Sequence, residues 1–294
     1  MSTTTERVLT RPAPAGHTPA RRKPNWSLIT RVGLLLIAAV LTLGPVMWTL
    51  STSLRSPSES FKLPPSFIPW NPDFTSYSEV FQKLDIVILV LNSALVTGLI
   101  AVGQMMTAAM AGYAFANLKF RGRGLLFSIV LATMMVPVQV TIVPVFMLIR
   151  GMGLSDTLLA LILPAIPTAF GTFLMRQYFM GLPAELGEAA AIDGASPWRT
   201  FQSVYAPLAV PGMAIVGILA FNFHWNEFFR PLILTISEQN FTLPLGLVSL
   251  QGNLGTGSIS VVLAGVVLSM IPALVVFMFG QRALQDGLTA GTGK

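Results

Sequence analysis

Long apolar segments separated by short polar ones are the feature that most restricts the fold of this chain. An α-helix rises about 1.5 Å per residue, so roughly 20 apolar residues cross the ~30 Å hydrocarbon core of a bilayer. With 53% hydrophobic and only 10% charged residues, the chain is too apolar for a soluble domain of its length. We therefore predict an all-α integral membrane protein with six transmembrane helices, at about 32–50, 86–116, 125–149, 157–173, 208–223 and 259–280.

The segments outside these spans are polar or basic. Residues 1–27 carry too little apolar surface to fold, so we expect a disordered basic tail, followed by a membrane domain over 28–294. A cleaved signal peptide is the alternative for the first apolar run, because small residues follow it at 51–53, but the tail ahead is long for that role. We expect polar loops at 55–85 and 227–257, and kinks in the third span at Pro137 and Pro144.

The distribution of positive charge predicts the orientation of the chain in the membrane. If the six spans alternate in direction, thirteen of the 18 Lys and Arg residues fall on one side, together with both termini and the segment 183–207. We expect that side to be cytoplasmic. The basic residues lie at membrane flanks, which favours lipid and disfavours nucleic acid as their partner. The five on the other side are Arg55, Lys62, Lys83, Arg150 and Arg230.

A polar, alanine-rich segment from Pro183 to Pro211 interrupts the apolar pattern. Strong helix formers follow Pro183, and the Asp-Gly pair at 193–194 favours a turn. Ser196-Pro197 is typical of an N-cap and the first residue of a second helix. We predict two short helices joined by a sharp turn, with small side chains at 189–191 that another protein can approach closely. An ordinary amphipathic hairpin at the membrane surface is the alternative.

Several motifs resemble those of the permeases of binding-protein-dependent ATP-binding-cassette (ABC) importers. Glu188-Ala189-Ala190 and Asp193-Gly194-Ala195, followed by Phe201 and Pro207, resemble their EAA loop. Other motifs resemble the carbohydrate branch of these permeases. They are Asn92-Ser93, Gly112 to Ala116, Pro137, Gly153 to Thr157, Trp225 to Phe228 and Gly287 to Gly291.

The resemblance implies a type I permease fold in the inner (plasma) membrane. It also implies a heterodimeric pore with a second, homologous permease subunit, two cytoplasmic ATPase subunits and an extracytoplasmic solute-binding protein. Coupling to the ATPase subunits would then rest on Glu188, Ala189, Ala190, Asp193, Gly194 and Ala195.

The sequence offers no energy source of its own. The predicted spans hold no Asp or Glu, which argues against proton or sodium coupling, and Asp85 and Glu227 at span ends are expected to point to water. No GxxxxGK[ST] loop is present, so we expect ATP and Mg²⁺ on the partner ATPase subunits and no cofactor in this chain. Without cysteine and with only His17 and His224, no metal site is expected. We predict a transport subunit without catalytic activity.

Sugars are neutral and rich in hydroxyl groups, so a pathway for them would use amide side chains and aromatic faces. The alternatives are hydrogen bonds between helices for the amides and an interfacial anchor for Trp225, and we expect His224 at the interface as well. The glycine-rich outer loop is either a flexible connector or, by the resemblance, a contact with the binding protein through Gly252, Asn253 and Gly255. The pathway candidates are Asn92, Gln104, Gln139, Asn222, Trp225 and Asn226.

The sequence thus predicts the permease subunit of an ABC importer for a sugar, with a di- or oligosaccharide favoured. A permease of the same class for a glycerol phosphodiester or a polyamine is the nearer alternative, although the near absence of Arg and Lys from the spans disfavours a phosphate-bearing solute. An integral-membrane enzyme built on Glu185, Glu188 and Asp193 is a distant alternative, because neither His nor Cys accompanies these carboxylates.

Overall fold

The computed structural model describes residues 26–59, 71–252 and 257–290, and every regular element in these ranges is a helix. The chain divides into two units, Met1–Met47 and Trp48–Lys294. The described part of the first unit is the beginning of helix α1 (Trp26–Ser53), whose section Thr30–Ser53 has the length and the mean hydropathy of 2.0 expected of a membrane span. The expected tail at 1–27 lies outside the described residues except for Trp26 and Ser27, which already belong to α1.

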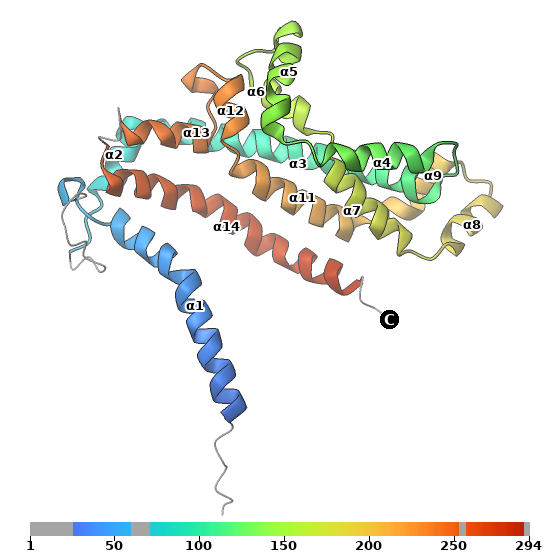
Figure 1. Ribbon diagram of the computed structural model, residues 1–294, viewed down its shortest axis with the longest axis horizontal. Coiled ribbons are helices and arrows are strands. Elements are labelled where there is room, and N and C mark those ends of the chain that lie inside the picture. The colour runs from blue at the N-terminus through green and yellow to red at the C-terminus, as the bar shows by residue number, and fades with distance from the viewer. Residues whose placement is uncertain (1–25, 60–70, 253–256, 291–294) are drawn as a thin grey trace, which may run out of the picture. The chain divides into compact units, whose positions relative to one another are not determined.

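The second unit is organised around the long helix α3 (Ile86–Asn117). It packs against α7 (Ala169–Met180) and α11 (Val210–Trp225), and α11 packs in turn against α14 (Ile259–Ala290), as Figure 1 shows. Asp85 is exposed, as expected, and its carboxylate caps α3 by accepting a hydrogen bond from the backbone of Ile88 at 3.3 Å.

α3 and α7 approach closely at Gly112. A β-carbon at this position would lie 2.6 Å from Cβ of Met175 and 2.8 Å from the backbone nitrogen of Arg176. Contacts this short cannot be relieved by turning a flexible side chain, because a Cβ atom and backbone atoms make them. The small residue therefore sets the distance between the two helices.

Three pairs of helices are each bent at a short break. α4 (Arg123–Thr133) and α5 (Val138–Gly151) meet at 100°, and the break contains Pro137, whose extended backbone precedes α5. The expected kink at Pro137 is thus confirmed, whereas α5 continues past Pro144. α6 (Leu158–Ile162), with the turn that follows it, meets α7 at 41°, and Pro197–Leu208 meets α11 at 74°.

These pairs decide how many spans the chain has. In the described ranges three single helices have the length and hydropathy of a span, in α1, α3 and α14, and there are six spans if each bent pair counts as one. The fourth predicted span, 157–173, is too short, because α7 runs on to Met180.

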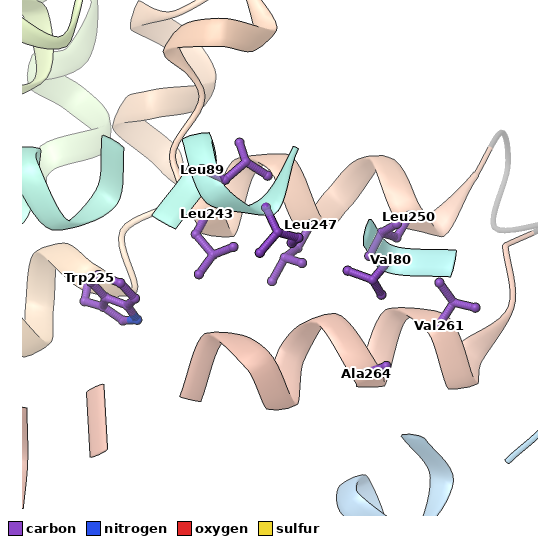
Figure 2. Close-up of a cluster of buried hydrophobic side chains, with 9 residues drawn as sticks. Val80, Leu89, Trp225, Leu243, Leu247, Leu250, Val261 and Ala264 are labelled. Atoms are coloured by element: carbon purple, nitrogen blue, oxygen red, sulfur yellow. The ribbon is translucent and has the colours of Figure 1, made fainter. Parts of the chain in front are cut away.

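The segments expected to be loops contain short helices, so that prediction is wrong in part. α2 (Thr75–Lys83) lies within 55–85, and α12 (Phe229–Leu234) and α13 (Leu243–Val248) lie within 227–257. Each buries apolar side chains that a loop would leave in water. Figure 2 shows Val80 of α2 and Leu243 of α13 in one buried cluster, which also includes Ile86, Leu89, Trp225, Leu247, Leu250, Val261 and Ala264.

Candidate functional site

The segment that resembles the EAA loop forms two short helices around a tight turn. α8 (Glu185–Ile192) is followed by a turn at Gly194, which has φ +75° and donates its backbone N–H to the carbonyl of Ala191 at 3.1 Å. The N–H of Ala195 donates to the carbonyl of Ala190 at 3.0 Å, which completes a Schellman motif. The left-handed backbone at 194 costs a residue with a β-carbon about 1–2 kcal/mol, so glycine suits this turn.

The second helix of the segment begins as the sequence predicts. Ser196 caps α9 (Pro197–Thr200), since its hydroxyl accepts a hydrogen bond from the N–H of Arg199 at 3.3 Å. A π-helical turn (Phe201–Tyr205) and α10 (Ala206–Leu208) follow, and the chain then bends into α11. We call Glu185–Leu208 the coupling segment, after the role that the resemblance implies for it.

The coupling segment rests on an aromatic cluster at the ends of α3 and α7. The Tyr113 ring lies 5.2 Å from that of Phe201, 5.1 Å from that of Tyr205 and 6.0 Å from that of Phe179. The hydroxyl of Tyr113 donates to the carbonyl of Pro197 at 3.2 Å. These contacts anchor α9 and the turn after it to the helices of the membrane domain.

The opposite side of the coupling segment is exposed. Glu188, Ala189, Asp193 and Gly194 are exposed, and Ala195 is half-buried. Ile192, at the tip of α8, has 87% of its surface exposed. Ala190 is buried, so the expected low surface at 189–191 is formed by Ala189 and Ala191 alone.

A cavity of about 740 Å³ lies between α3, the α4–α5 break, the α6–α7 connection, α11 and α12. Its wall is mostly apolar. Its polar lining includes Gln104 from α3, Asn222 and His224 from α11, Glu227 from the turn that follows, and Arg230 from α12. A mostly apolar cavity with a few converging polar groups is typical of a small-molecule site.

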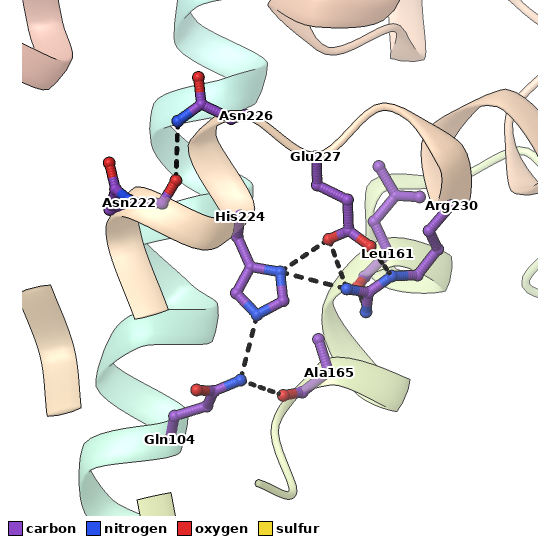
Figure 3. A network of polar contacts seen from close by, with 8 residues as sticks. All are labelled: Gln104, Leu161, Ala165, Asn222, His224, Asn226, Glu227 and Arg230. Atoms are coloured by element: carbon purple, nitrogen blue, oxygen red, sulfur yellow. Dashed lines mark hydrogen bonds and ion pairs between the residues drawn. The ribbon is translucent and has the colours of Figure 1, made fainter. Parts of the chain in front are cut away.

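Four of these side chains form a continuous hydrogen-bonded network, drawn in Figure 3. Arg230 Nε donates to Glu227 Oε1 at 2.8 Å, and Arg230 Nη1 donates to the carbonyl of Leu161 at 3.1 Å. Glu227 Oε2 lies 2.7 Å from His224 Nδ1, and His224 Nε2 lies 3.1 Å from Gln104 Nε2. Gln104 Nε2 also donates to the carbonyl of Ala165 at 2.8 Å.

The partners of His224 determine its tautomer. His224 Nδ1 lies 2.7 Å from a carboxylate oxygen of Glu227, which can only accept, and 3.1 Å from Arg230 Nη2, which can only donate. The shorter contact is the hydrogen bond, so Nδ1 carries the proton and donates it to Glu227. Gln104 Nε2 is held as a donor by the carbonyl of Ala165, so His224 Nε2 accepts from it. His224 is therefore a neutral imidazole that links a charged pair to an amide.

Of the six predicted pathway residues, Gln104 and Asn222 are part of the cavity wall. Asn92 donates to the carbonyls of Gln239 and Phe241 at 2.8 and 3.0 Å, which is the alternative of a hydrogen bond between segments. Gln139 is exposed outside the wall, and Asn226 donates to the carbonyl of Asn222 at 2.8 Å.

Trp225 is buried in the core, with 3% of its surface exposed. Its ring stacks on that of Phe221 with centroids 5.4 Å apart, and its indole N–H donates to the carbonyl of Ser269 at 3.1 Å. It is thus neither on the cavity wall nor an interfacial anchor in this structure. In the outer loop, Gly252 is exposed with φ +66°, and Asn253 and Gly255 lie outside the described residues.

The expectation that Glu227 points to water is wrong, and His224 is buried beside it. The side chains of His224, Glu227 and Arg230 are 6%, 13% and 10% exposed. Arg230 of α12 contacts His224, Glu227 and the carbonyl of Leu161 on α6, so these segments cover the end of α11. The spacing of three between the positions 224, 227 and 230 was the signal in the sequence, because residues three apart can face one another on a helical path.

Comparisons with known proteins show the family to which this chain belongs. The model described as "Binding-protein-dependent transport system inner membrane component" matches residues 104–289. The arabinooligosaccharides transport system permease protein AraQ of Bacillus subtilis (strain 168) is 34% identical, over 92% of this chain and 98% of AraQ. The sn-glycerol-3-phosphate transport system permease protein UgpE of Yersinia pestis bv. Antiqua (strain Antiqua) is 30% identical, over 87% of this chain and 93% of UgpE.

A solved structure is also similar. It is the crystal structure of a bacterial ABC transporter involved in the import of the acidic polysaccharide alginate. One of its chains matches with a TM-score of 0.77 and 27% identity, over 90% of this chain and 99% of that chain.

Proposed function

This chain belongs to the family of binding-protein-dependent transport system inner membrane components, and on that premise we propose that it is a permease subunit of an ABC importer for a di- or oligosaccharide. The chain is a multi-pass membrane protein of the transport class. In the proposal it has no catalytic activity, and it pairs with a second, homologous permease subunit. Two ATPase subunits bind at the cytoplasmic face, where both termini lie, and a solute-binding protein delivers the sugar from the other side.

The geometry of the coupling segment is the observation that carries this proposal. An element that transmits a movement must be rigid, must be anchored to the part that moves and must present a surface to the part that drives it. The capped turn at Gly194 provides the rigidity, and the Tyr113 cluster provides the anchor. Glu188, Ala189, Asp193 and Ile192 provide an exposed surface with a prominent apolar tip. ATP and Mg²⁺ are bound by the ATPase subunits, and their closure moves this surface.

The cavity is the proposed section of the translocation pathway. It lies beside α3, the same helix that carries Tyr113, so one rigid element joins the cavity wall to the coupling segment. The proposed solute class is supported by the similarity to AraQ, which is named as a permease protein of an arabinooligosaccharides transport system. UgpE and the alginate transporter are named for anionic solutes. Relatives therefore differ in the charge of their solutes, and the charge of the cavity wall is what distinguishes the two kinds of solute for this chain. The outer loop with Gly252, Asn253 and Gly255 is proposed to contact the binding protein.

Uptake measurements test the proposal directly. Cells that express the whole transporter, with and without this chain, are given radiolabelled arabinotriose, trehalose, maltose and sn-glycerol-3-phosphate. We expect uptake of at least one of the three sugars to require this chain. Uptake of sn-glycerol-3-phosphate alone would contradict the sugar assignment and leave the importer class in place.

Gly194→Val tests the role of the coupling segment. We expect at least about a tenfold loss of uptake while the ATPase subunits still hydrolyse ATP, because the strained turn displaces the docking surface. Gly122→Val is the matched control, since Gly122 also has a positive φ, +82°, and open space around it, but lies outside the coupling segment. Equal losses in the two variants, or unchanged coupling in Gly194→Val, would contradict the assignment.

A further inference from the structure

The charged groups in the cavity wall neutralise each other. Among the described lining residues, Arg230 is the sole Lys or Arg and Glu227 the sole Asp or Glu. They form an ion pair with two hydrogen bonds between guanidinium and carboxylate. With His224 neutral, the polar part of the wall carries no net charge.

The network also fixes the side chain of Gln104. Its Nε2 donates both hydrogens, one to the carbonyl of Ala165 and one to His224 Nε2. A flipped amide would place its oxygen against the carbonyl oxygen of Ala165, so this orientation is the stable one. The Oε1 atom of Gln104 accepts no hydrogen bond from the described residues, and it is not a buried unsatisfied atom. It is therefore an accessible acceptor on a residue that lines the cavity.

We propose that Gln104, His224, Glu227 and Arg230 form a neutral solute-contact site, at which Oε1 of Gln104 accepts a hydrogen bond from a hydroxyl group of an uncharged, hydroxyl-rich solute. Gln104 is the contacting residue. His224, Glu227 and Arg230 are positioning residues that act through it. The inference rests on the proposed function, because it takes the cavity to be part of the pathway.

The same network disfavours an anionic solute. Arg230 already donates through Nε and Nη2 to Glu227 and through Nη1 to the carbonyl of Leu161. A phosphate or carboxylate on the two remaining N–H groups of Arg230 would lie close to the charge of Glu227, and one that displaced Glu227 would leave it as an unpaired, largely buried charge. A sugar hydroxyl needs no charge and can donate to Gln104 while the ion pair stays intact.

The charge of the wall is tested first, with cysteine labelling in the assembled transporter. The chain has no cysteine, so Asn222→Cys places a single thiol on the cavity wall and the unsubstituted chain is the blank. The thiol is labelled with an anionic methanethiosulfonate, which carries a sulfonate, and with a cationic one, which carries a trimethylammonium group. We expect the ratio of the two rates to lie within about twofold of that for a free thiol in water, because the nearby charges cancel. A strong preference for the anionic reagent, or no labelling at all, would overturn the proposal.

Glu227→Gln in the same background removes the partner of Arg230. We expect the rate ratio to shift at least about threefold towards the anionic reagent, because an unpaired cation then faces the cavity. Gly151→Cys, at an exposed glycine outside the cavity wall, is the control position at which the ratio should not change. No shift at Asn222→Cys would show that the ion pair does not set the charge of the wall.

The contact itself is tested by Gln104→Met, which removes the acceptor and nearly keeps the volume. For whichever neutral sugar the wild-type transporter imports, we expect KM to rise about three- to tenfold, because the solute loses one hydrogen bond. Met106→Leu, on the same helix but outside the cavity wall, is the control. A KM within twofold of wild type would overturn the contact. If no neutral sugar is imported, the substrate class of the proposed function fails, while the labelling experiment still decides the charge of the wall.

Discussion

The hydroxyl of Tyr113 donates a 3.2 Å hydrogen bond to the backbone carbonyl of Pro197, the first residue of α9. Tyr113 lies on α3 nine residues after Gln104, a rise of about 13.5 Å along the helix. One helix therefore carries both a residue of the cavity wall and the main anchor of the coupling segment.

Tyr113→Phe is expected to weaken this connection and keep the ring in the aromatic cluster. The loss of one hydrogen bond should lower the free energy of unfolding by about 1 kcal/mol and reduce the sugar taken up per ATP hydrolysed. Both quantities are measured on the purified transporter in proteoliposomes. Tyr77→Phe is the control, because it removes the 2.8 Å hydrogen bond between Tyr77 and Ser53, far along the chain from the coupling segment. Equal effects on coupling from the two substitutions would contradict the role of Tyr113.

Gly112→Ala is expected to push α3 and α7 apart. The added methyl group meets Cβ of Met175 and the backbone of Arg176, and overpacking of this kind costs about 1–3 kcal/mol. The midpoint of thermal unfolding of the purified transporter should fall. Gly98→Ala, on the same helix and with nothing within 4 Å of the added atom, should instead be neutral or stabilise the helix by about 0.5–1 kcal/mol. A Gly112→Ala variant as stable as Gly98→Ala would show that the helices are free to separate.

The elements that sequence reasoning predicts well are those with local causes. The turn at Asp193-Gly194 follows from the backbone freedom of glycine, and the start of α9 follows from the Ser196 cap and Pro197. The helices α3 and α14 could be predicted from the length and composition of their apolar runs alone. In each case the decisive interaction lies within a few residues of the chain.

The predictions that failed depend on partners far away in the sequence. A charged residue after an apolar run, such as Glu227, is expected to face water unless other segments cover it. Arg230, three positions later, supplies the ion pair, but the segment that covers the pair carries the carbonyls of Leu161 and Ala165, more than 60 positions earlier. Trp225 is buried for the same reason, because α14 supplies the carbonyl of Ser269 that its indole needs. Neither partner can be read from the residues around 225.

Trp225→Phe separates a core role from a pathway role. The smaller ring loses the hydrogen bond to Ser269 and leaves space beside Phe221, so we expect a loss of about 1–3 kcal/mol in the free energy of unfolding. KM for sugar uptake should not change, because Trp225 does not line the cavity. Trp198→Phe, at a position with 55% of its surface exposed, should cost less than about 0.5 kcal/mol. A raised KM with unchanged stability would contradict the core role and support a pathway role for Trp225.

Asp156 is expected to make the stability of the α5–α6 connection depend on pH. Its carboxylate accepts hydrogen bonds from the hydroxyl of Ser237 and from the backbone N–H groups of Ile236 and Ser237, the latter two at 2.8 and 3.0 Å. These bonds hold the pKa of Asp156 well below its ordinary value, and the bond from the Ser237 hydroxyl has the largest effect. A lowered pKa in the folded state means that the stabilisation is fully present above the unfolded pKa of about 4 and is lost as the pH falls towards the folded pKa.

Asp156→Asn keeps the shape of the side chain, and Asn also tolerates the left-handed backbone at φ +57°. We expect the variant to unfold at a lower temperature than wild type at pH 6, and the difference to shrink between about pH 4 and pH 3, because only the wild type loses stability there. Glu238→Gln removes a negative charge from an exposed side chain of the same segment and controls for the change in net charge. A difference between wild type and Asp156→Asn that stays constant or grows as the pH falls would contradict the assigned role of the carboxylate.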